Sequence, residues 1–342
     1  MNEHNDYLWD RSGPEDPEVK RLESLLGQYK QGEVNSPLPA DYADKPIVLW
    51  LALPLAAAAT LLIAFMGSRE VPVAPQTSWT IERVTGAPTV NADRLESDGI
   101  VTAGTWIQTD DTSTAVVQVG KIGKVQIEPN SRVQLVSTDP TNNRLSLMSG
   151  TLQATVWAPP RLFFVETPSA TAIDLGCAYT LSVDGEGRAR LCVTSGWVAL
   201  EKSGHEEVVV PSGAVCETRP QHGPGTPYFG GASDEFRQAL SRFDFEGASS
   251  EDLETVLRES NMCELFTLWQ LLPSVRDLHR GMIYDRMSQI MPPPEGVTRE
   301  GVLALDSRML EAWGVEFSRE EFMPCLTSCT ADLAEGTTDL RI

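Results

Sequence analysis

The sequence predicts an all-β domain, a sandwich or a β-solenoid, that follows a single transmembrane helix and precedes a small all-α module. Three patterns support this fold class. Residues 47–67 carry no charge, residues 79–218 alternate apolar and polar side chains, and apolar residues recur at helical spacing from residue 233 onward. These are the patterns of a membrane span, of strands and of packed helices. The expected segments are a short N-terminal segment at 1–46, the transmembrane helix at 47–67, the β domain at 71–222, a linker at 223–232 and the helical module at 233–342.

The first 46 residues are predicted to contain one short amphipathic helix. Asp16 is a suitable N-cap, and Pro17 takes the first helical position. The candidate partner-binding residues are Leu8, Trp9, Val19, Leu22 and Leu26. So short a helix cannot bury its apolar stripe alone. It therefore frays, lies on the membrane or docks on a partner protein, and the residues leave these three alternatives open.

Residues 47–67 are predicted to cross a membrane. At 1.5 Å per residue, this run of 21 uncharged residues spans a hydrocarbon core of about 30 Å. It begins too far from Met1 for a secretory signal and lacks an A-x-A cleavage site. The flanks 30–46 and 67–86 each carry two Lys or Arg residues, so their charges leave the orientation open. All six cysteines follow the span, and an oxidising compartment would suit them.

The charge of the chain argues against direct binding to nucleic acid. The 342 residues include 27 Lys or Arg and 48 Asp or Glu, a net charge of −21. No basic cluster interrupts this acidity, and an acidic surface repels phosphate backbones. We therefore expect protein partners and a membrane, and no nucleic acid.

The β region is predicted from alternating apolar residues that are separated by Gly, Pro, Asn and Asp clusters about every ten residues. The inward positions are expected at Ala115, Val117, Val119, Val125, Ile127, Val133, Leu135, Leu145, Leu147, Tyr179, Leu181 and Val183. The clearest hairpin turns at 184–187, which would place Cys192 opposite Tyr179 and diagonal to Cys177. We expect both cysteines to be small buried apolar residues, with a disulfide between them as the alternative.

A short pattern recurs within the β region. Residues 144–152 resemble residues 190–198 at an offset of 46, and a shorter echo follows at 211–215. Each copy contains a Ser-Gly pair and predicts a strand, a tight turn and a second strand. The glycine is expected to supply a positive φ or a bulge rather than a ligand contact.

Five helices are predicted after residue 233. Their starts and ends are marked by Ser233, by Ser249, by Pro292–Pro294 and by Thr298. The expected core residues are Phe236, Leu240, Phe243, Leu253, Val256, Leu257, Leu265, Leu268, Leu272, Val275, Leu278, Ile283, Met287, Ile290, Val302, Leu305, Met309 and Trp313. The fifth helix is expected to run without a break from residue 298 through Trp313.

The sequence shows no catalytic, cofactor or metal site, and we expect a protein that is not an enzyme. No two of the four histidines are spaced as a helical metal pair, and Cys325-x3-Cys329 has no second cysteine pair to complete a zinc site. Residues 223–230 lack the Lys-Ser/Thr of a phosphate loop. No nucleophile elbow, kinase motif set or H-E-x-x-H occurs.

The β region resembles the FecR domain of bacterial single-pass regulators over about residues 80–220. The matching residues are Gly104, Trp106, Ile107, Thr109, Asp110, Ala115, Gly120, Pro129, Ser131, Leu145, Leu147, Gly150, Phe164, Val165, Thr167, Pro168, Leu175, Gly176, Tyr179, Leu181, Val183, Val193, Gly196 and Val198. The resemblance implies a bacterial inner-membrane protein with residues 1–46 in the cytoplasm and a periplasmic regulatory β domain.

Two hypotheses follow. In the first, the chain is a signalling protein whose β domain binds an envelope protein and whose N-terminal segment controls an alternative sigma factor. In the second, it is an anchored structural or assembly protein of the envelope, which binds other proteins through the β domain and the helical tail.

Overall fold

The computed structural model describes residues 78–202, 207–247 and 249–317. The chain divides into two compact units, Met1–Pro72 and Val73–Ile342, and the described residues all belong to the second. The predicted N-terminal helix, the five candidate residues from Leu8 to Leu26 and the predicted span 47–67 lie outside them. Within the described ranges, every helix is too short or too polar to cross a bilayer.

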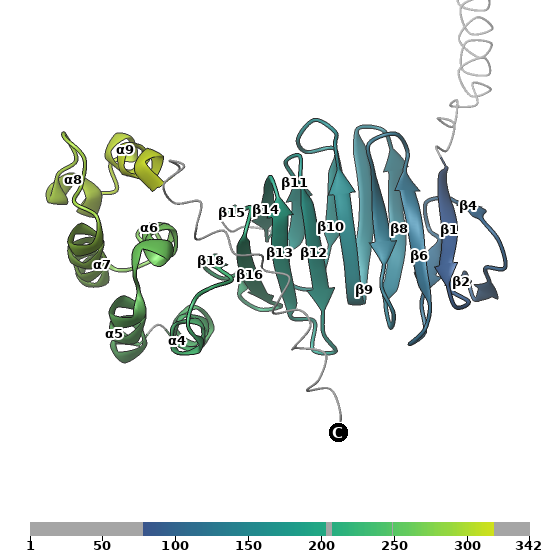
Figure 1. The fold of residues 1–342 in the computed structure, drawn as a ribbon, viewed down its shortest axis with the longest axis horizontal. Coiled ribbons are helices and arrows are strands. Elements are labelled where there is room, and N and C mark those ends of the chain that lie inside the picture. Colours follow the sequence, from purple (N-terminus) through teal and green to yellow (C-terminus); the bar gives the residue numbers. More distant parts are fainter. Residues whose placement is uncertain (1–77, 203–206, 248, 318–342) are drawn as a thin grey trace, which may run out of the picture. The chain divides into compact units, whose positions relative to one another are not determined.

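The β domain consists of two sheets that share strand β9 (Figure 1). The first sheet contains, in spatial order, β4 (Gly99–Val101), β1 (Trp79–Thr85), β6 (Thr114–Val119), β7 (Gly123–Ile127), the second half of β9 (Asn142–Val156), β12 (Ala178–Val183), β13 (Ala189–Ser195) and β16 (Ala214–Arg219), with β17 (Gly223–Pro224) and β18 (Tyr228–Phe229) both paired to β16. The second sheet contains β3 (Asp93–Arg94), β2 (Thr89–Val90), β5 (Trp106–Gln108), β8 (Arg132–Asp139), the first half of β9, β10 (Phe163–Glu166), β11 (Thr171–Asp174), β14 (Trp197–Glu201) and β15 (Val208–Pro211). Strands β9 and β10 pair in parallel, and the other ladders are antiparallel.

One apolar core lies between the two sheets, and the alternation in the sequence predicts it well. Val117 of the first sheet and Leu145 of the second are both fully buried in this core. All twelve inward positions expected from the alternation are buried. The prediction of a mostly β domain is therefore confirmed.

The recurring Ser-Gly pairs mark corners at which the chain passes from one sheet to the other. Gly150, Gly196 and Gly213 all have positive φ, between 72° and 90°. At Gly150 the strand does not turn back, as the repeat predicted, but β9 continues from one sheet into the other. A Cβ on Gly150 would collide with the backbone of Ser131, so only glycine fits this corner.

The corner at Gly150 also changes which positions face the core. Before it, the odd-numbered Leu145 and Leu147 are buried, whereas after it the even-numbered Leu152 and Ala154 are buried. A strand of strict period two cannot make this change, since its side chains alternate without interruption. The left-handed glycine supplies the extra rotation of the backbone.

The 184–188 hairpin differs from its predicted register by one residue. Asp184 and Arg188 close a five-residue loop, because the N–H of Asp184 donates to the carbonyl oxygen of Arg188. Cys192 therefore pairs with Thr180 rather than with Tyr179. A shift of one residue moves a side chain to the other face. Cys177 accordingly lies in the core between the sheets and Cys192 in a second core, so the alternative of a bridge between them is wrong.

The helical module follows most of the predicted pattern. Its elements are α4 (Asp234–Phe245), α5 (Ser250–Glu259), the 3-10 helix η1 (Met262–Glu264), α6 (Leu265–Leu271), α7 (Asp277–Ile290), α8 (Arg299–Leu303) and α9 (Ser307–Phe317). Ser233, Ser249 and Thr298 accept N-cap hydrogen bonds as expected. Leu278 differs from the prediction, since it is 76% exposed at the start of α7.

The predicted fifth helix is broken in two. Leu305 has a φ of 57°, which no helix interior accepts. The Asp306 carboxylate accepts the N–H groups of Arg308 and Met309, at 3.0 and 3.2 Å, and so caps a new helix. An Asp side chain competes with the helical backbone in this way, so Asp306 is the sequence signal for the break.

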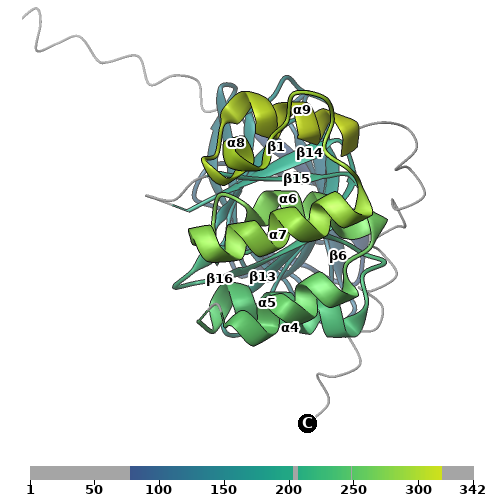
Figure 2. The same ribbon diagram turned by 90° about the vertical axis from the view of Figure 1, so that its left-hand side faces the viewer.

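The helices pack on the β15–β18 end of the β domain (Figures 1 and 2). Cys192, Val215 and Tyr228 belong to a second core that also contains the inward residues of α4 to α9. Strands β13 and β16 are therefore buried on both faces over part of their length. Residues 223–232, expected as a linker, contain β17 and β18, and Tyr228 is buried.

Candidate interaction surface of the β domain

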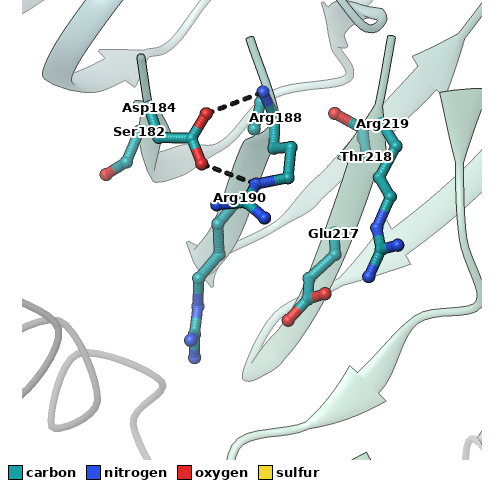
Figure 3. A pocket seen from close by; sticks show the side chains of 8 residues that line it. Ser182, Asp184, Arg188, Arg190, Glu217, Thr218 and Arg219 are labelled. Carbon is teal, nitrogen blue, oxygen red and sulfur yellow. Dashed lines mark hydrogen bonds and ion pairs between the residues drawn. The ribbon is translucent and has the colours of Figure 1, made fainter. Parts of the chain in front are cut away.

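A charged pocket of about 260 Å³ opens on β12, β13 and β16 (Figure 3). It is lined by Ser182, Asp184, Arg188, Ala189, Arg190, Glu217, Thr218 and Arg219. Arg190 and Glu217 are partners in the β13–β16 ladder, so their strands place them side by side. The three arginines and two carboxylates give the pocket groups for recognising charged ligands.

The rim of the pocket is fixed by the 184–188 loop. The Asp184 carboxylate accepts the N–H groups of Glu186 and Arg188, at 2.9 and 3.0 Å, and the Arg188 guanidinium at 2.7 Å. Burial acts to raise the pKa of Asp184, but the hydrogen bonds from Arg188 and Glu186 outweigh it and lower this pKa. Asp184 therefore stays ionised and holds Arg188 at the mouth of the pocket.

The opposite wall is joined to the helical module. The Arg219 guanidinium lies 4.5 Å from the centre of the Phe245 ring and donates to Ser241 Oγ at 3.2 Å. Ser241 in turn donates to Glu217 at 3.3 Å. These contacts connect β16 with α4, so the position of the helices determines the shape of this wall.

Asp244 lies at the end of α4, next to the same wall. Its carboxylate accepts the N–H of Thr226 at 2.6 Å and the Thr226 hydroxyl at 3.0 Å. Burial raises the pKa of Asp244 to about 6, the Thr226 hydrogen bonds oppose this rise, and Glu217 adds to it. The junction between the sheet and α4 therefore contains a carboxyl group that titrates near neutral pH.

Cys177 forms a buried polar pair with Asp174. Its Sγ donates to Asp174 Oδ1 at 2.5 Å, and both residues are buried. Burial and the neighbouring carboxylate raise the pKa of this thiol far above its ordinary value. A cysteine nucleophile must reach the thiolate form. The pair therefore suits structural support of the β11–β12 corner rather than nucleophilic catalysis.

Two exposed tryptophans flank that corner. Trp157 follows β9 and is 61% exposed, and Trp197 begins β14 and is 47% exposed. Their backbones lie on either side of the loop 175–177, because Val156 N–H donates to the Cys177 carbonyl and Leu175 N–H to the Trp197 carbonyl. Exposed tryptophans are frequent anchors of protein interfaces. This edge is therefore a candidate surface for a protein partner.

The structure and the sequence identify different candidate sites. The five predicted partner-binding residues lie outside the described ranges, whereas the pocket and the two tryptophans were missed. Their side chains come from strands that are distant in sequence, so no local motif marks them. In the described part of the chain, no three His, Cys, Asp or Glu side chains are grouped to hold a metal.

The cysteines only partly follow the prediction. Cys177 is a free buried thiol, as expected. Cys192, expected to be a small apolar residue, is disulfide-bonded, and so is Cys263. The predicted register paired Cys192 with Tyr179 and so placed Cys192 in the core between the two sheets. In the structure its side chain faces the second core instead.

Comparison with known proteins identifies the β region. Residues 105–199 match the family described as FecR protein, which confirms the resemblance over this part of the chain. Two crystal structures of a candidate anti-sigma factor from Parabacteroides distasonis ATCC 8503, at 1.65 and 2.50 Å resolution, are similar at 13% identity and a TM-score of 0.32. Each match covers 40% of this chain and 64% of the other. No protein with a curated description matches.

Proposed function

We propose that this chain is a single-pass regulatory protein of the bacterial inner membrane. Residues 1–46 lie in the cytoplasm and control an alternative sigma factor, and the FecR domain lies outside and binds an envelope protein. The observation that carries the proposal is the FecR match at 105–199, which follows an uncharged run of 21 residues at 47–67. Such a run suits a single membrane anchor.

The geometry of the FecR domain supports binding rather than catalysis. The pocket carboxylate Asp184 is engaged by Arg188, and Glu217 accepts from Ser241, so these groups shape a surface. Trp157 and Trp197 offer apolar area at another edge of the same domain. Exposed aromatic anchors and charged rim groups are both typical of protein-protein interfaces.

Capture of a cytoplasmic partner by the full-length chain tests the proposal. Val19, Leu22 and Leu26 are replaced together by polar residues. Burial of each large apolar side chain contributes about 1.5–3 kcal/mol. The triple variant should therefore capture the sigma factor at least a hundredfold more weakly, since 1.4 kcal/mol is a tenfold change.

The matched control replaces Lys20, Ser24 and Gln28 of the same segment by alanine, which leaves the apolar stripe intact. This control should capture the sigma factor as the native chain does. Equal capture by the control and the stripe variant would contradict the proposal. Failure of the native chain to capture a sigma factor would favour the alternative, an anchored structural or assembly protein of the envelope.

A further inference from the structure

The register of the first sheet shows which connections share an end of that sheet. The start of β1 lies beside the end of β6, because Thr80 pairs with Gln118. The same end continues across the sheet, with the starts of β7, β12 and β16 beside the ends of β9 and β13. We call it the tryptophan end, since Trp157 follows β9 and Trp197 follows β13 there. Its connections are 102–105, 120–122, 157–162, 175–177, Gly196 and 212–213.

The two ends of the first sheet differ in charge. The connections at the tryptophan end contain Lys121, Arg161 and neither Asp nor Glu. The connections at the opposite end, which we call the acidic end, contain Arg188 and the acidic residues Glu96, Asp98, Asp110, Asp111, Glu128, Asp184 and Glu186. In a chain of net charge −21, the connections at one end of this sheet thus lack acidic groups.

The tryptophan end combines exposed indoles with a basic side chain. Trp157 is 61% exposed and Trp197 is 47% exposed. The Trp157 indole N–H donates to the carbonyl oxygen of Lys121 at 3.0 Å, which holds the ring against the β6–β7 turn. Arg161 is engaged by Glu207 at 2.7 Å, so Lys121 is the cation that this end offers. Tryptophan is enriched where lipid meets water, because its ring is apolar and its N–H is polar.

The chain enters the β domain at the tryptophan end. Ser78 directly precedes β1, and residues 68–77 separate it from the end of the predicted span at Gly67. Ten residues cover at most about 35 Å when fully extended. An anchor at 47–67 therefore keeps this end of the domain near the surface of the membrane.

We propose that the tryptophan end rests on the outer surface of the membrane, with Trp157 and Trp197 among the lipid head groups and Lys121 beside anionic phosphates. The inference rests on the membrane anchor of the proposed function. Both the charge of this end and the entry of the chain there favour lipid over a protein as the occupant. Asp184 and Arg188 of the charged pocket belong to the acidic end, so the pocket is left open to an envelope protein.

Tryptophan fluorescence of the full-length chain in vesicles tests the contact. The vesicles contain phosphatidylglycerol and phosphatidylcholine in equal amounts, with or without a lipid that carries a nitroxide quencher on its head group. The difference in emission between the native chain and Trp157→Phe/Trp197→Phe isolates these two indoles among the eight of the chain. We expect the quencher lipid to remove most of this difference. An undiminished difference, as for indoles covered by a protein or surrounded by water, would overturn the contact.

Replacement of Lys121 tests the part played by charge. Lys121→Gln should lower the ratio of quenched to unquenched emission from the two indoles about fivefold, the effect of one basic side chain at an anionic surface. The matched control Arg258→Gln removes an exposed cation from the helical module and should leave this ratio unchanged. Equal ratios for the two variants would overturn the role of Lys121.

Flotation of the same vesicles after an alkaline wash separates this inference from the proposed function. A chain that leaves the vesicles has no membrane anchor, which would overturn the proposed function and the inference together. A chain that floats with both indoles unquenched keeps the anchor and overturns only the contact of the tryptophan end with lipid.

Discussion

In the β domain the chain changes direction at glycines with positive φ, whereas in the helical module one buried arginine joins the ends of helices. Gly150 and Gly196 each take a backbone conformation that other residues rarely adopt. Arg280 is only 8% exposed and binds carbonyl groups at the ends of two helices. The β domain thus depends on backbone geometry at its corners, and the module on one side chain with many hydrogen bonds.

The contacts of Arg280 explain this role. Its guanidinium donates to the carbonyl oxygens of Leu272 at 2.9 Å, Val275 at 2.9 Å and Leu303 at 2.7 Å. Leu272 is the C-cap of α6, and Leu303 is the last residue of α8. Helix C-termini carry unsatisfied carbonyl groups and a partial negative charge. A cation from α7 therefore satisfies both ends at once.

The largest expected effect is at the corner of β9. Gly150→Ala should lower the free energy of unfolding by about 4 kcal/mol, because the positive φ is strained for alanine and the new Cβ collides with Ser131. Chemical denaturation of the full chain measures this change. Hydrogen exchange should show the loss of protection in the β strands.

Substitutions at two other glycines distinguish the cost of backbone strain from the cost of the steric collision. Gly104 has a φ of 91° but open space around a new Cβ, so Gly104→Ala should cost about 1–2 kcal/mol. Gly185 has open space and no positive φ, and Gly185→Ala should change stability by less than about 0.5 kcal/mol. Similar costs at all three glycines would show that the corner geometry is unimportant.

A smaller effect is expected in the helical module. Arg280→Met should destabilise the module by about 3 kcal/mol, because three carbonyl oxygens lose their donor. Exchange should accelerate in α6, α7 and α8 and remain slow in β6 to β9. Arg258→Met is the control, since Arg258 is exposed and pairs with its neighbour Glu259. Loss of protection in both regions together would mean that they unfold as one unit.

The junction of the two regions should respond to pH. The pKa of Asp244 is about 6 in the folded chain, against an ordinary value of 3.8. Folding therefore favours the protonated carboxyl group, so its contribution is complete below about pH 4 and is lost as pH rises through 6. With allowance for partial exposure, unfolding free energy should fall by about 2 kcal/mol across this window.

The Asp244→Asn variant checks the source of this dependence. An asparagine keeps an acceptor for the Thr226 N–H and does not titrate. The difference between native and variant stability should therefore change with pH in the interval from 4 to 6 and be constant above about pH 7. Parallel pH profiles for the two chains would assign the dependence to other groups.

The sequence predicted the strands better than their connections. Alternation identified Val117 and Leu145 as core residues, because burial on one face imposes period two. The hairpin register failed at Asp184, since a carboxylate that accepts two N–H groups lengthened the loop. The prediction of one continuous helix from residue 298 through Trp313 was wrong for a similar reason. The Asp306 side chain caps a new helix, and this local cap competes with continuation of the first one.

The docking of the helices on the β domain has a signal in the sequence of two strands. Residues 191–193 of β13 and 214–216 of β16 are continuous apolar runs, and each run is buried on both faces. Continuous runs indicate strands covered on both sides. The charged pocket had no comparable signal, because Asp184, Arg190 and Glu217 come together only through strand pairing.

The corner at Gly150 has a consequence for how such a domain can change length over evolution. Because the inward positions change from odd to even at this residue, the two halves of β9 keep separate registers. A residue gained or lost in the first half shifts that half against β8 and β10 and leaves Leu152 and Ala154 facing inward. The glycine therefore confines an insertion to one sheet, and the other sheet keeps its core.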